Sequence, residues 1–311
     1  MKVRQHYVPQ FYLKKFARNT KPRKYIINCF DKSNSKKFTR NIKDIAMENY
    51  FYDNQEPPIV EDIFAYLESH SSIIFDKIIE EESIKNLTDT ERTIFSLFIF
   101  FQYSRTRSAR EFFSQVAKLI YEHYEEDKNY PKINNFDLQI LRKFLEDRGH
   151  TAQINIMFGP KGEKPNEFLT IAEETSKLIF NLEWNITKNN FKREFYTGDH
   201  PVIIYNPYSD EKMISGYGIQ ALKSPGVEIF FPLTPKLCLI IYDKRVSEYK
   251  DVSSVRDVKR EELDWINIQI IAESYRFIFT KGNDFQFVKQ VLKEYPELKN
   301  INRNRIYIID K

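Results

Sequence analysis

The sequence predicts an α+β fold in which a mixed or antiparallel sheet is assembled from N- and C-terminal segments, with a helical middle region. Strand-like runs occur within residues 1–55 and again within residues 182–311, whereas residues 56–181 show helical periodicity. The 311 residues are 41% hydrophobic and 15% aromatic, enough for a large core. We therefore expect one interlocked domain over residues 1–311, in which these three ranges are regions.

The chain opens on the stretch Gln5–Phe16, which combines polar and aromatic side chains around a proline. Pro9 suits the first turn of a helix and biases the residue before it toward extended geometry. Gln5 and His6 are therefore expected in extended chain just before a short helix. A helix start of this kind is either an anion site or an N-terminal arm whose polar groups pair with backbone.

The rest of the first region predicts short strands with turns between them. Residues 25–30 and 36–40 form one expected pair, residues 41–49 a short helical turn, and residues 50–52 a further strand-like piece. In the middle region, helices are expected over 59–84, 88–103, 108–127, 136–148 and 165–181, with residues 150–165 as a loop or hairpin tip.

The helix over 88–103 is apolar on nearly every side, which is typical of a buried helix. Thr88 and Glu91 form a capping-box signature at its start. At its end lie Gln102, Arg105 and Arg107. Gln102 and Arg105 share a helix face, and the arginines are either partners of the helix C-terminus or a clamp for an anion.

The last region is expected to be mostly β. The strands fall at 182–187, 193–197, 202–204, 227–231, 237–242, 275–279 and 305–309, with helices over 254–274 and 284–294. A compact turn at 197–202 carries Asp199 and His200. Asp199 either closes the turn or offers a carboxylate at a strand end beside His200.

Charge is distributed unevenly along the chain. Residues 1–43 contain thirteen Lys or Arg and one acidic residue, a net charge of +12, so the remaining residues carry −8 of the total of +4. This basic region either faces a polyanion, with RNA favoured, or docks on acidic runs such as 80–82 and 125–127.

Composition excludes several classes of protein. Glycine is scarce, with 8 residues, and no glycine-rich phosphate loop or dinucleotide fingerprint occurs. Cys29 and Cys238 show no metal-binding or redox spacing. We expect no cofactor and no metal. The start of the chain lacks a signal-peptide apolar region, and the apolar run 94–101 is too short to span a bilayer, so a cytoplasmic protein without a membrane partner is expected.

Several motifs in order together resemble one bacterial family, catalogued as domain of unknown function 4238. They are residues 5–13, 43–45 with 48–52, 67–68, 101–107, 197–202, 231–235 and 267–276. The resemblance covers nearly the whole chain and implies no established activity. It also implies Ser-Asp-Asn-Pro at 198–201, where this chain has Gly-Asp-His-Pro. His200 thus stands where relatives carry Asn, which favours His6 and Asp199 as the better catalytic pair.

The leading functional hypothesis is a nucleic-acid-directed enzyme, a metal-independent ribonuclease or related phosphotransfer protein of toxin or phage-defence type. It requires one cleft in which His6 is the general acid or base, Arg105 stabilises developing charge and Asp199 orients His6 or a water. The expected substrate-binding residues are Gln5, Gln10, Lys14, Lys15, Gln102, Arg107 and His200. The alternative is a non-catalytic module that binds RNA, a nucleotide or a protein with the same groups.

Overall fold

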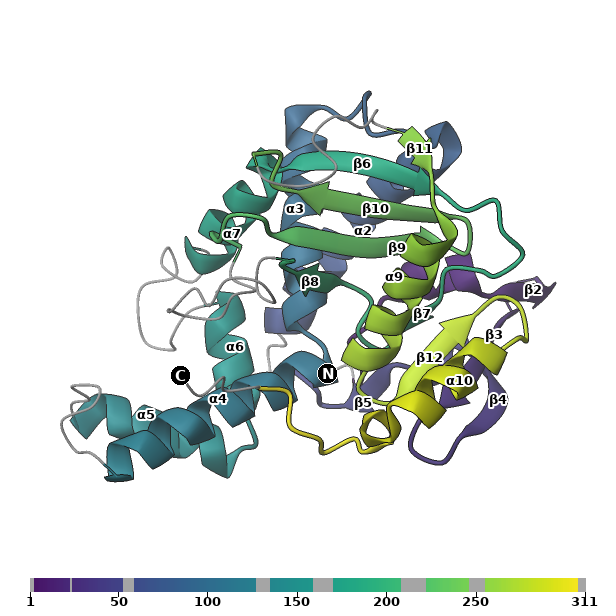
Figure 1. The fold of residues 1–311 in the computed structure, drawn as a ribbon. Coiled ribbons are helices and arrows are strands. Elements are labelled where there is room, and N and C mark those ends of the chain that lie inside the picture. Colours follow the sequence, from purple (N-terminus) through teal and green to yellow (C-terminus); the bar gives the residue numbers. More distant parts are fainter. Residues whose placement is uncertain are drawn as a thin grey trace.

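The computed structural model describes residues 3–22, 24–52, 59–126, 135–158, 170–207, 222–245 and 255–306. The fold is α+β, as predicted (Figure 1). In the N-terminal region the elements are β1 (Arg4–His6), α1 (Gln10–Leu13), η1 (Lys14–Phe16), β2 (Arg18–Lys21), β3 (Lys24–Asp31), β4 (Lys36–Asn41), η2 (Ile42–Asp44) and β5 (Met47–Asn49). The extended chain before Pro9 and the short helix after it are confirmed.

The middle region is helical. Its elements are α2 (Ile59–Glu81), α3 (Asp89–Ser104), α4 (Arg107–Glu126), α5 (Asn135–Glu146), α6 (His150–Phe158) and α7 (Thr170–Asn181). The capping box between Thr88 and Glu91 is present. The prediction of a loop over 150–165 is wrong for 150–158, because the Asp147 carboxylate accepts the Thr151 N–H and opens a new helix. Residues 159–165 lie outside the described chain.

The C-terminal region is mixed. It contains β6 (Glu183–Lys188), β7 (Thr197–Gly198), β8 (Ile203–Tyr205), β9 (Glu228–Thr234), β10 (Leu237–Tyr242), β11 (Val255–Asp257), α9 (Arg260–Glu273), β12 (Phe277–Thr280), α10 (Gln286–Glu294) and η3 (Pro296–Lys299). The predicted helix over 254–274 begins later than expected, because residues 255–257 pair in parallel with β6. The strand predicted at 305–309 falls mostly outside the described residues.

One sheet joins the two ends of the chain, as the sequence predicts. Its strand order is β2-β3-β12-β7, and β4 also pairs with β3. The antiparallel register sets Asp31 opposite Phe277 and Cys29 opposite Phe279. A second sheet has the order β11-β6-β10-β9-β8, and β1 and β5 form a separate pair. The short strand predicted at 50–52 is replaced by β5, three residues earlier, because pairing with β1 decides its position.

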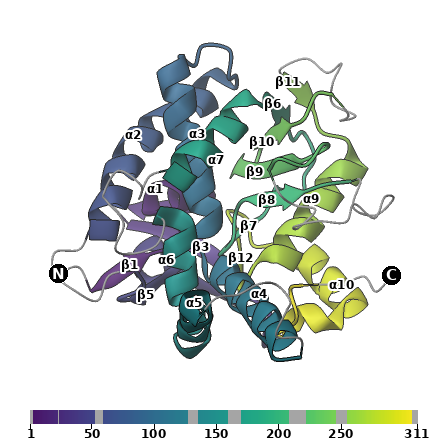
Figure 2. The same cartoon turned by 90° about the vertical axis from the view of Figure 1, so that its left-hand side faces the viewer.

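The sheet β11-β6-β10-β9-β8 is buried on both faces, which explains why its central strands are apolar at successive positions. In β10, Leu239 and Ile241 pack toward α2, α3 and α7, whereas Cys238 and Ile240 pack toward α9. Figure 2 shows this layering, with α2, α3 and α7 on one side of the sheet and α9 on the other. The N-terminal helix α1 contacts α2, so β1 lies against the helical layer.

Candidate functional site

The strand β1 separates two clefts. His6 is the last residue of β1 and Tyr7 follows it directly, and the two side chains line different clefts. His6 lines a cleft of about 330 Å³ between β1–α1 and α2, which we call the His6 cleft. Tyr7 lines a cleft of about 440 Å³ beside β4, β5 and β12, which we call the Arg40 cleft. The opening stretch of the chain is therefore the wall that both clefts share.

The His6 cleft contains groups suited to acid–base chemistry. Its lining consists of His6, Gln10, Phe11, Glu61, Phe64, Ala65, Glu68, Ser69 and Ser72. The His6 imidazole is partly buried, and its Nε2 lies 3.3 Å from the Ile42 carbonyl oxygen. Of the residues predicted from sequence, the structure places His6 and Gln10 together on this surface.

Arg105 reaches the His6 cleft only through Glu68. Its side chain is 1% exposed, and its Nη1 donates to the Glu68 carboxylate at 2.7 Å. Its Nε and Nη2 donate to Gln102 Oε1 at 3.1 and 2.8 Å, which confirms the shared helix face predicted for this pair. The guanidinium also lies 4.8 Å from the centre of the Phe64 ring. In this arrangement Arg105 orients a carboxylate of the cleft and is not displayed to a ligand.

Gln5 and Gln102 hold β1 in place. The Gln5 side-chain oxygen accepts the Tyr52 N–H at 2.6 Å, and Gln102 Nε2 donates to the Tyr7 carbonyl at 3.1 Å. Both glutamines are fully buried. The structure therefore keeps these two predicted substrate-binding residues away from solvent, where they satisfy backbone groups that would otherwise be orphaned.

Asp199 lies in a separate, fully buried network. Its carboxylate accepts the backbone N–H groups of Tyr275, Arg276 and Phe277 at 2.7, 2.8 and 2.8 Å. Burial raises the pKa of the Asp199 carboxyl, and the three N–H donors and the Lys32 ammonium oppose that shift. The carboxylate is absent from the lining of both clefts. The structure does not bring it to the cleft that His6 lines.

The neighbouring cation, Lys32, is also fully buried. Its ammonium donates to the carbonyl oxygens of Ile271 and Ser274 at 2.5 and 2.7 Å, at the C-terminus of α9. A helix C-terminus is partly negative and favours a cation there, whereas burial lowers the pKa of the Lys32 ammonium well below its usual value. Lys32 thus counts toward the +12 of the first 43 residues but contributes nothing to their surface.

His200 is unsuited to proton transfer near neutral pH. Its ring is 2% exposed, and Nδ1 lies 2.5 Å from the Thr106 hydroxyl. Burial, and to a lesser degree the charge of Arg305, lowers its pKa to about 3. The imidazole is neutral at pH 7 and acts as a buried hydrogen-bonding group, in agreement with the sequence argument against an essential His200.

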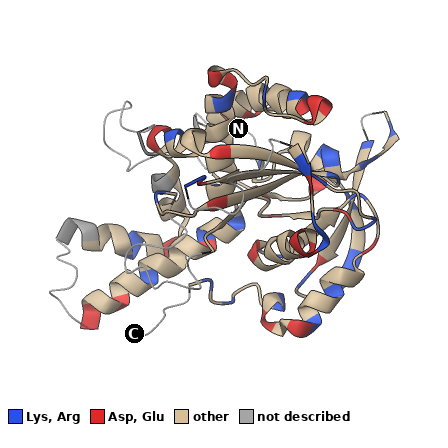
Figure 3. Cartoon of the chain, turned by 45° about the horizontal axis from the view of Figure 1, so that its top comes forward, with Lys and Arg blue, Asp and Glu red and all other residues tan. Residues whose placement is uncertain are grey.

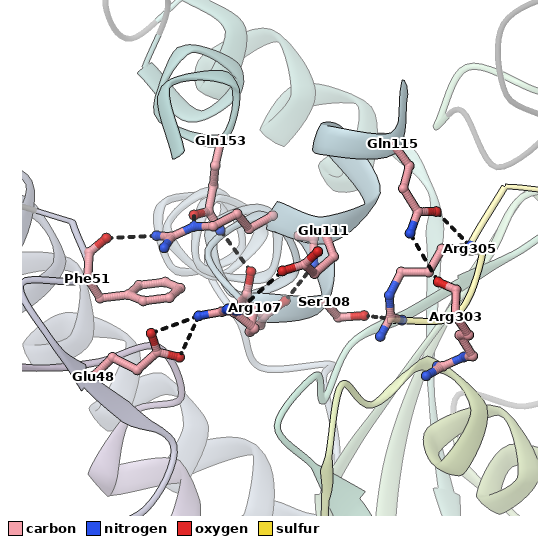
Figure 4. Close-up of polar contacts among 12 residues, drawn as sticks. Glu48, Phe51, Arg107, Ser108, Glu111, Gln115, Gln153, Arg303 and Arg305 are labelled. Carbon is pink, nitrogen blue, oxygen red and sulfur yellow. Dashed lines mark hydrogen bonds and ion pairs between the residues drawn. The ribbon is translucent and has the colours of Figure 1, made fainter. Parts of the chain in front are cut away.

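Arg107 connects the Arg40 cleft to α4. It donates to Glu48, a residue of that cleft, at 3.0 and 3.2 Å, and lies 3.4 Å from Glu111 (Figure 4). In the same view Arg305 donates to the Ser108 hydroxyl at 2.7 Å. These contacts tie the last described segment of the chain to the start of α4.

The remaining predicted residues lie outside both clefts. Lys14 is exposed, with its ammonium 4.8 Å from the centre of the Tyr25 ring, and Lys15 pairs with Asp76 on α2. The structure therefore brings His6 and Gln10 together, links Gln102 and Arg105 to them through Glu68, and leaves the other predicted residues apart.

The Arg40 cleft was missed by the sequence reasoning. Its lining consists of Tyr7, Asp31, Phe38, Arg40, Asp44, Ile45, Ala46, Met47, Glu48, Arg276 and Phe277. A signal was present in β4, where alternate residues Lys36, Phe38 and Arg40 share one face of a strand. Its partners at the start of β12 follow far later along the chain and could not be placed beside it.

Basic side chains remain exposed around β2, β3 and β4. We call the set Lys21, Lys24, Lys36, Lys37, Arg40 and Lys43 the basic hairpin region. Among the described residues, the basic side chains of residues 1–43 form ion pairs at Arg4–Asp44 and Lys15–Asp76, and none of the six does so. Blue positions recur along these hairpins, on the right-hand side of Figure 3. Docking on the acidic runs 80–82 and 125–127 is not seen in the described residues.

A family model described as a protein of unknown function, DUF4238, matches residues 4–284. The chain belongs to the DUF4238 family. The resemblance deduced from the motifs is thereby confirmed. Neither a curated protein nor a solved structure matches the chain.

The match to DUF4238 covers every residue that lines the two clefts, and it ends before α10. In this DUF4238 protein, the described residues contain no cluster of three or more His, Cys, Asp or Glu side chains arranged to hold a metal ion. Among the same residues, no helix has the length and apolar character that crossing a membrane requires.

Proposed function

We propose that this protein binds RNA through the basic hairpin region. The observation that carries the proposal is that this region's six basic side chains are exposed and lack carboxylate partners among the described residues. Lysines and arginines left unpaired on a surface attract a phosphate backbone and release its counterions on binding. An RNA strand lying along β2–β4 would also pass the Arg40 cleft, where two arginines stand beside aromatic rings.

Salt dependence tests this proposal directly. Filter retention of single-stranded RNA is measured for the wild type between 50 and 300 mM KCl, with single-stranded DNA as a second arm. We compare a quadruple variant, Lys21→Gln, Lys24→Gln, Lys36→Gln and Lys37→Gln, with the wild type. Each lysine that pairs with a phosphate should contribute about 0.7 to the slope of log K against log salt, so the variant's slope should be shallower by up to about 3.

The matched control removes the same charge elsewhere. It carries Lys118→Gln, Lys177→Gln, Lys289→Gln and Lys293→Gln, all exposed and outside the basic hairpin region. We expect it to retain RNA with the wild-type slope. Absence of RNA retention by the wild type at 50 mM salt, or equally weakened retention by both variants, would refute the proposal.

A second candidate is a ribonuclease that uses His6. It is favoured by one observation, the presence of His6 with Glu61 and Glu68 on a single cleft. His6 would take the proton of the attacking hydroxyl or supply one to the leaving oxygen, and Glu68, held by Arg105, would accept a hydrogen bond from the substrate. In this version Arg105 is a positioning residue and Asp199 a structural one.

Cleavage assays test the ribonuclease. Wild type and His6→Ala are incubated with mixed RNA, DNA and nucleotides in the presence of a chelator. The ribonuclease predicts cleavage of RNA by the wild type and its loss in His6→Ala, with RNA retention unchanged. Intact substrates after incubation with the wild type would leave RNA binding as the function and exclude the enzyme.

A further inference from the structure

The Arg40 cleft combines cations and aromatic rings in a way that the basic hairpin region alone does not. Phe38 and Phe277 form an edge-to-face pair with ring centres 5.9 Å apart. The Arg40 guanidinium lies 5.6 Å from the Phe38 ring, and the Arg276 guanidinium lies 4.9 Å from the Phe277 ring. Each arginine is thus set beside an aromatic face at the rim of a 440 Å³ cleft.

Arg276 is oriented in advance of any ligand. Its Nε and Nη2 donate to one oxygen of Asp31 at 3.0 and 2.7 Å, and its side chain remains 39% exposed. Burial favours the neutral carboxyl, but the hydrogen bonds from Arg276 and Ser33 leave the pKa of Asp31 below its usual value. Nη1 makes no hydrogen bond within the described residues. One edge of the guanidinium is therefore free to donate to an anion.

The carboxylates of the cleft do not oppose an anion there. Asp31 pairs with Arg276, Asp44 pairs with Arg4 at 2.6 Å, and Glu48 pairs with Arg107 at 3.0 Å. Arg40 has no carboxylate partner among the described residues. The charged lining residues together with Arg4 and Arg107 therefore carry one positive charge in excess, that of Arg40, and Arg107 also lies 3.4 Å from Glu111 on α4.

We propose that the Arg40 cleft binds a nucleoside phosphate, with the phosphate between Arg40 and Arg276 and the base against Phe38. This inference rests on the proposed RNA binding and names the nucleotide-sized subsite within it. The two arginines supply charge-assisted hydrogen bonds, and the half-buried Phe38 ring, which lines the cleft, offers a stacking surface that every base can use. The cleft volume lies within the range of small-ligand pockets, roughly 300–1,000 Å³.

A matched pair of variants separates the cleft from general surface charge. Arg40→Gln removes a charge from the cleft, whereas Lys289→Gln removes one from an exposed position on α10, outside both the cleft and the basic hairpin region. Phe38→Leu removes the stacking surface, and its thermal melt is compared with that of the wild type to exclude unfolding.

Binding is measured by isothermal titration calorimetry with AMP, GMP, CMP and UMP, and with inorganic phosphate alone. We expect at least one nucleotide to bind the wild type more tightly than inorganic phosphate does. Arg40→Gln should weaken it about tenfold or more, because a charge-assisted hydrogen bond is removed. Phe38→Leu should weaken it by about fivefold or more. Lys289→Gln should stay within about twofold, because its charge lies outside the cleft and is screened at physiological salt.

Several outcomes would overturn the subsite. They are absence of binding by all four nucleotides, inorganic phosphate binding as tightly as the nucleotides, or equally weakened binding by Arg40→Gln and Lys289→Gln. If the wild type retains RNA but binds no mononucleotide, the subsite fails and the proposed function stands. If nucleotides bind in an Arg40-dependent manner but RNA is not retained, RNA binding fails and the cleft is a site for free nucleotides.

Discussion

Replacing Asp199 by Asn should destabilise the protein strongly, because the carboxylate holds the backbone that leads into β12. One oxygen accepts the N–H groups of Arg276 and Phe277, and the other accepts that of Tyr275. Asn is nearly the same size but has only one acceptor oxygen. Placed to keep two of these bonds, it sets its own NH₂ group against the third N–H.

The magnitude follows from two donors that are left without an acceptor in a fully buried site. They are the third backbone N–H and the NH₂ group of the introduced Asn. Each unsatisfied buried donor costs about 1–3 kcal/mol, so Asp199→Asn should lower the free energy of unfolding by about 2–6 kcal/mol. At about 2 °C per kcal/mol for a chain of this size, the Tm should fall by roughly 4–12 °C.

Circular dichroism melts measure this change. The control is Asp257→Asn, at an exposed aspartate at the end of β11, for which a shift below about 1–2 °C is expected. If the Asp199 carboxylate instead served catalysis, Asp199→Asn should have a Tm close to that of the control. A fall of less than about 2 °C in Asp199→Asn would therefore refute the structural role.

The other predictions concern buried titratable groups. His200 has a lowered pKa in the folded protein, about 3, so its contribution to stability is complete above the unfolded pKa near 6.5 and is lost as the pH falls toward 3. Urea melts at pH 7, 6 and 5 should show His200→Asn losing less stability than the wild type, by up to about 1.4 kcal/mol per pH unit, and parallel profiles would contradict this. Arg105→Met should lower the free energy of unfolding by about 2–3 kcal/mol, because the oxygens of Gln102 and Glu68 lose their donor. Glu68→Gln keeps an acceptor for Arg105 and should lower it by less than half as much in the same melts. Burial raises the pKa of Cys29 to about 12 and raises that of Cys238 as well, so iodoacetamide at pH 8 should label the native protein only as fast as it unfolds.

Elements with regular periodicity could be predicted from the sequence. The apolar repeat identified α2, α3, α4, α5 and α7, and alternating or continuous apolar runs identified β3, β6, β9 and β10. The elements that were missed have weak local signals. In β11, charged Arg256 and Asp257 occupy an edge strand, and its pairing with β6 is set by the fold as a whole. The helix α6 begins at a cap supplied by Asp147, in a stretch that otherwise looked like a turn.

The candidate site was predictable where its contacts are local. Gln102 and Arg105 are three residues apart on a helix, and their contact is confirmed. The partners that decide what each residue does lie far along the chain. Glu68 precedes Arg105 by 37 residues, and the N–H groups that engage Asp199 follow it by 76 to 78 residues. A sequence shows that such a carboxylate exists but not whether it accepts hydrogen bonds from backbone N–H groups or faces solvent.

Hydrogen–deuterium exchange with and without single-stranded RNA reports where the RNA lies without altering the protein. RNA bound along the basic hairpin region should slow exchange over residues 18–48 and around residues 276–280, which form this region and the Arg40 cleft. Exchange in the helices α4 and α5 should be unchanged and serves as the internal reference. Protection confined to the helical middle region, with residues 18–48 unaffected, would contradict RNA binding by the basic hairpin region.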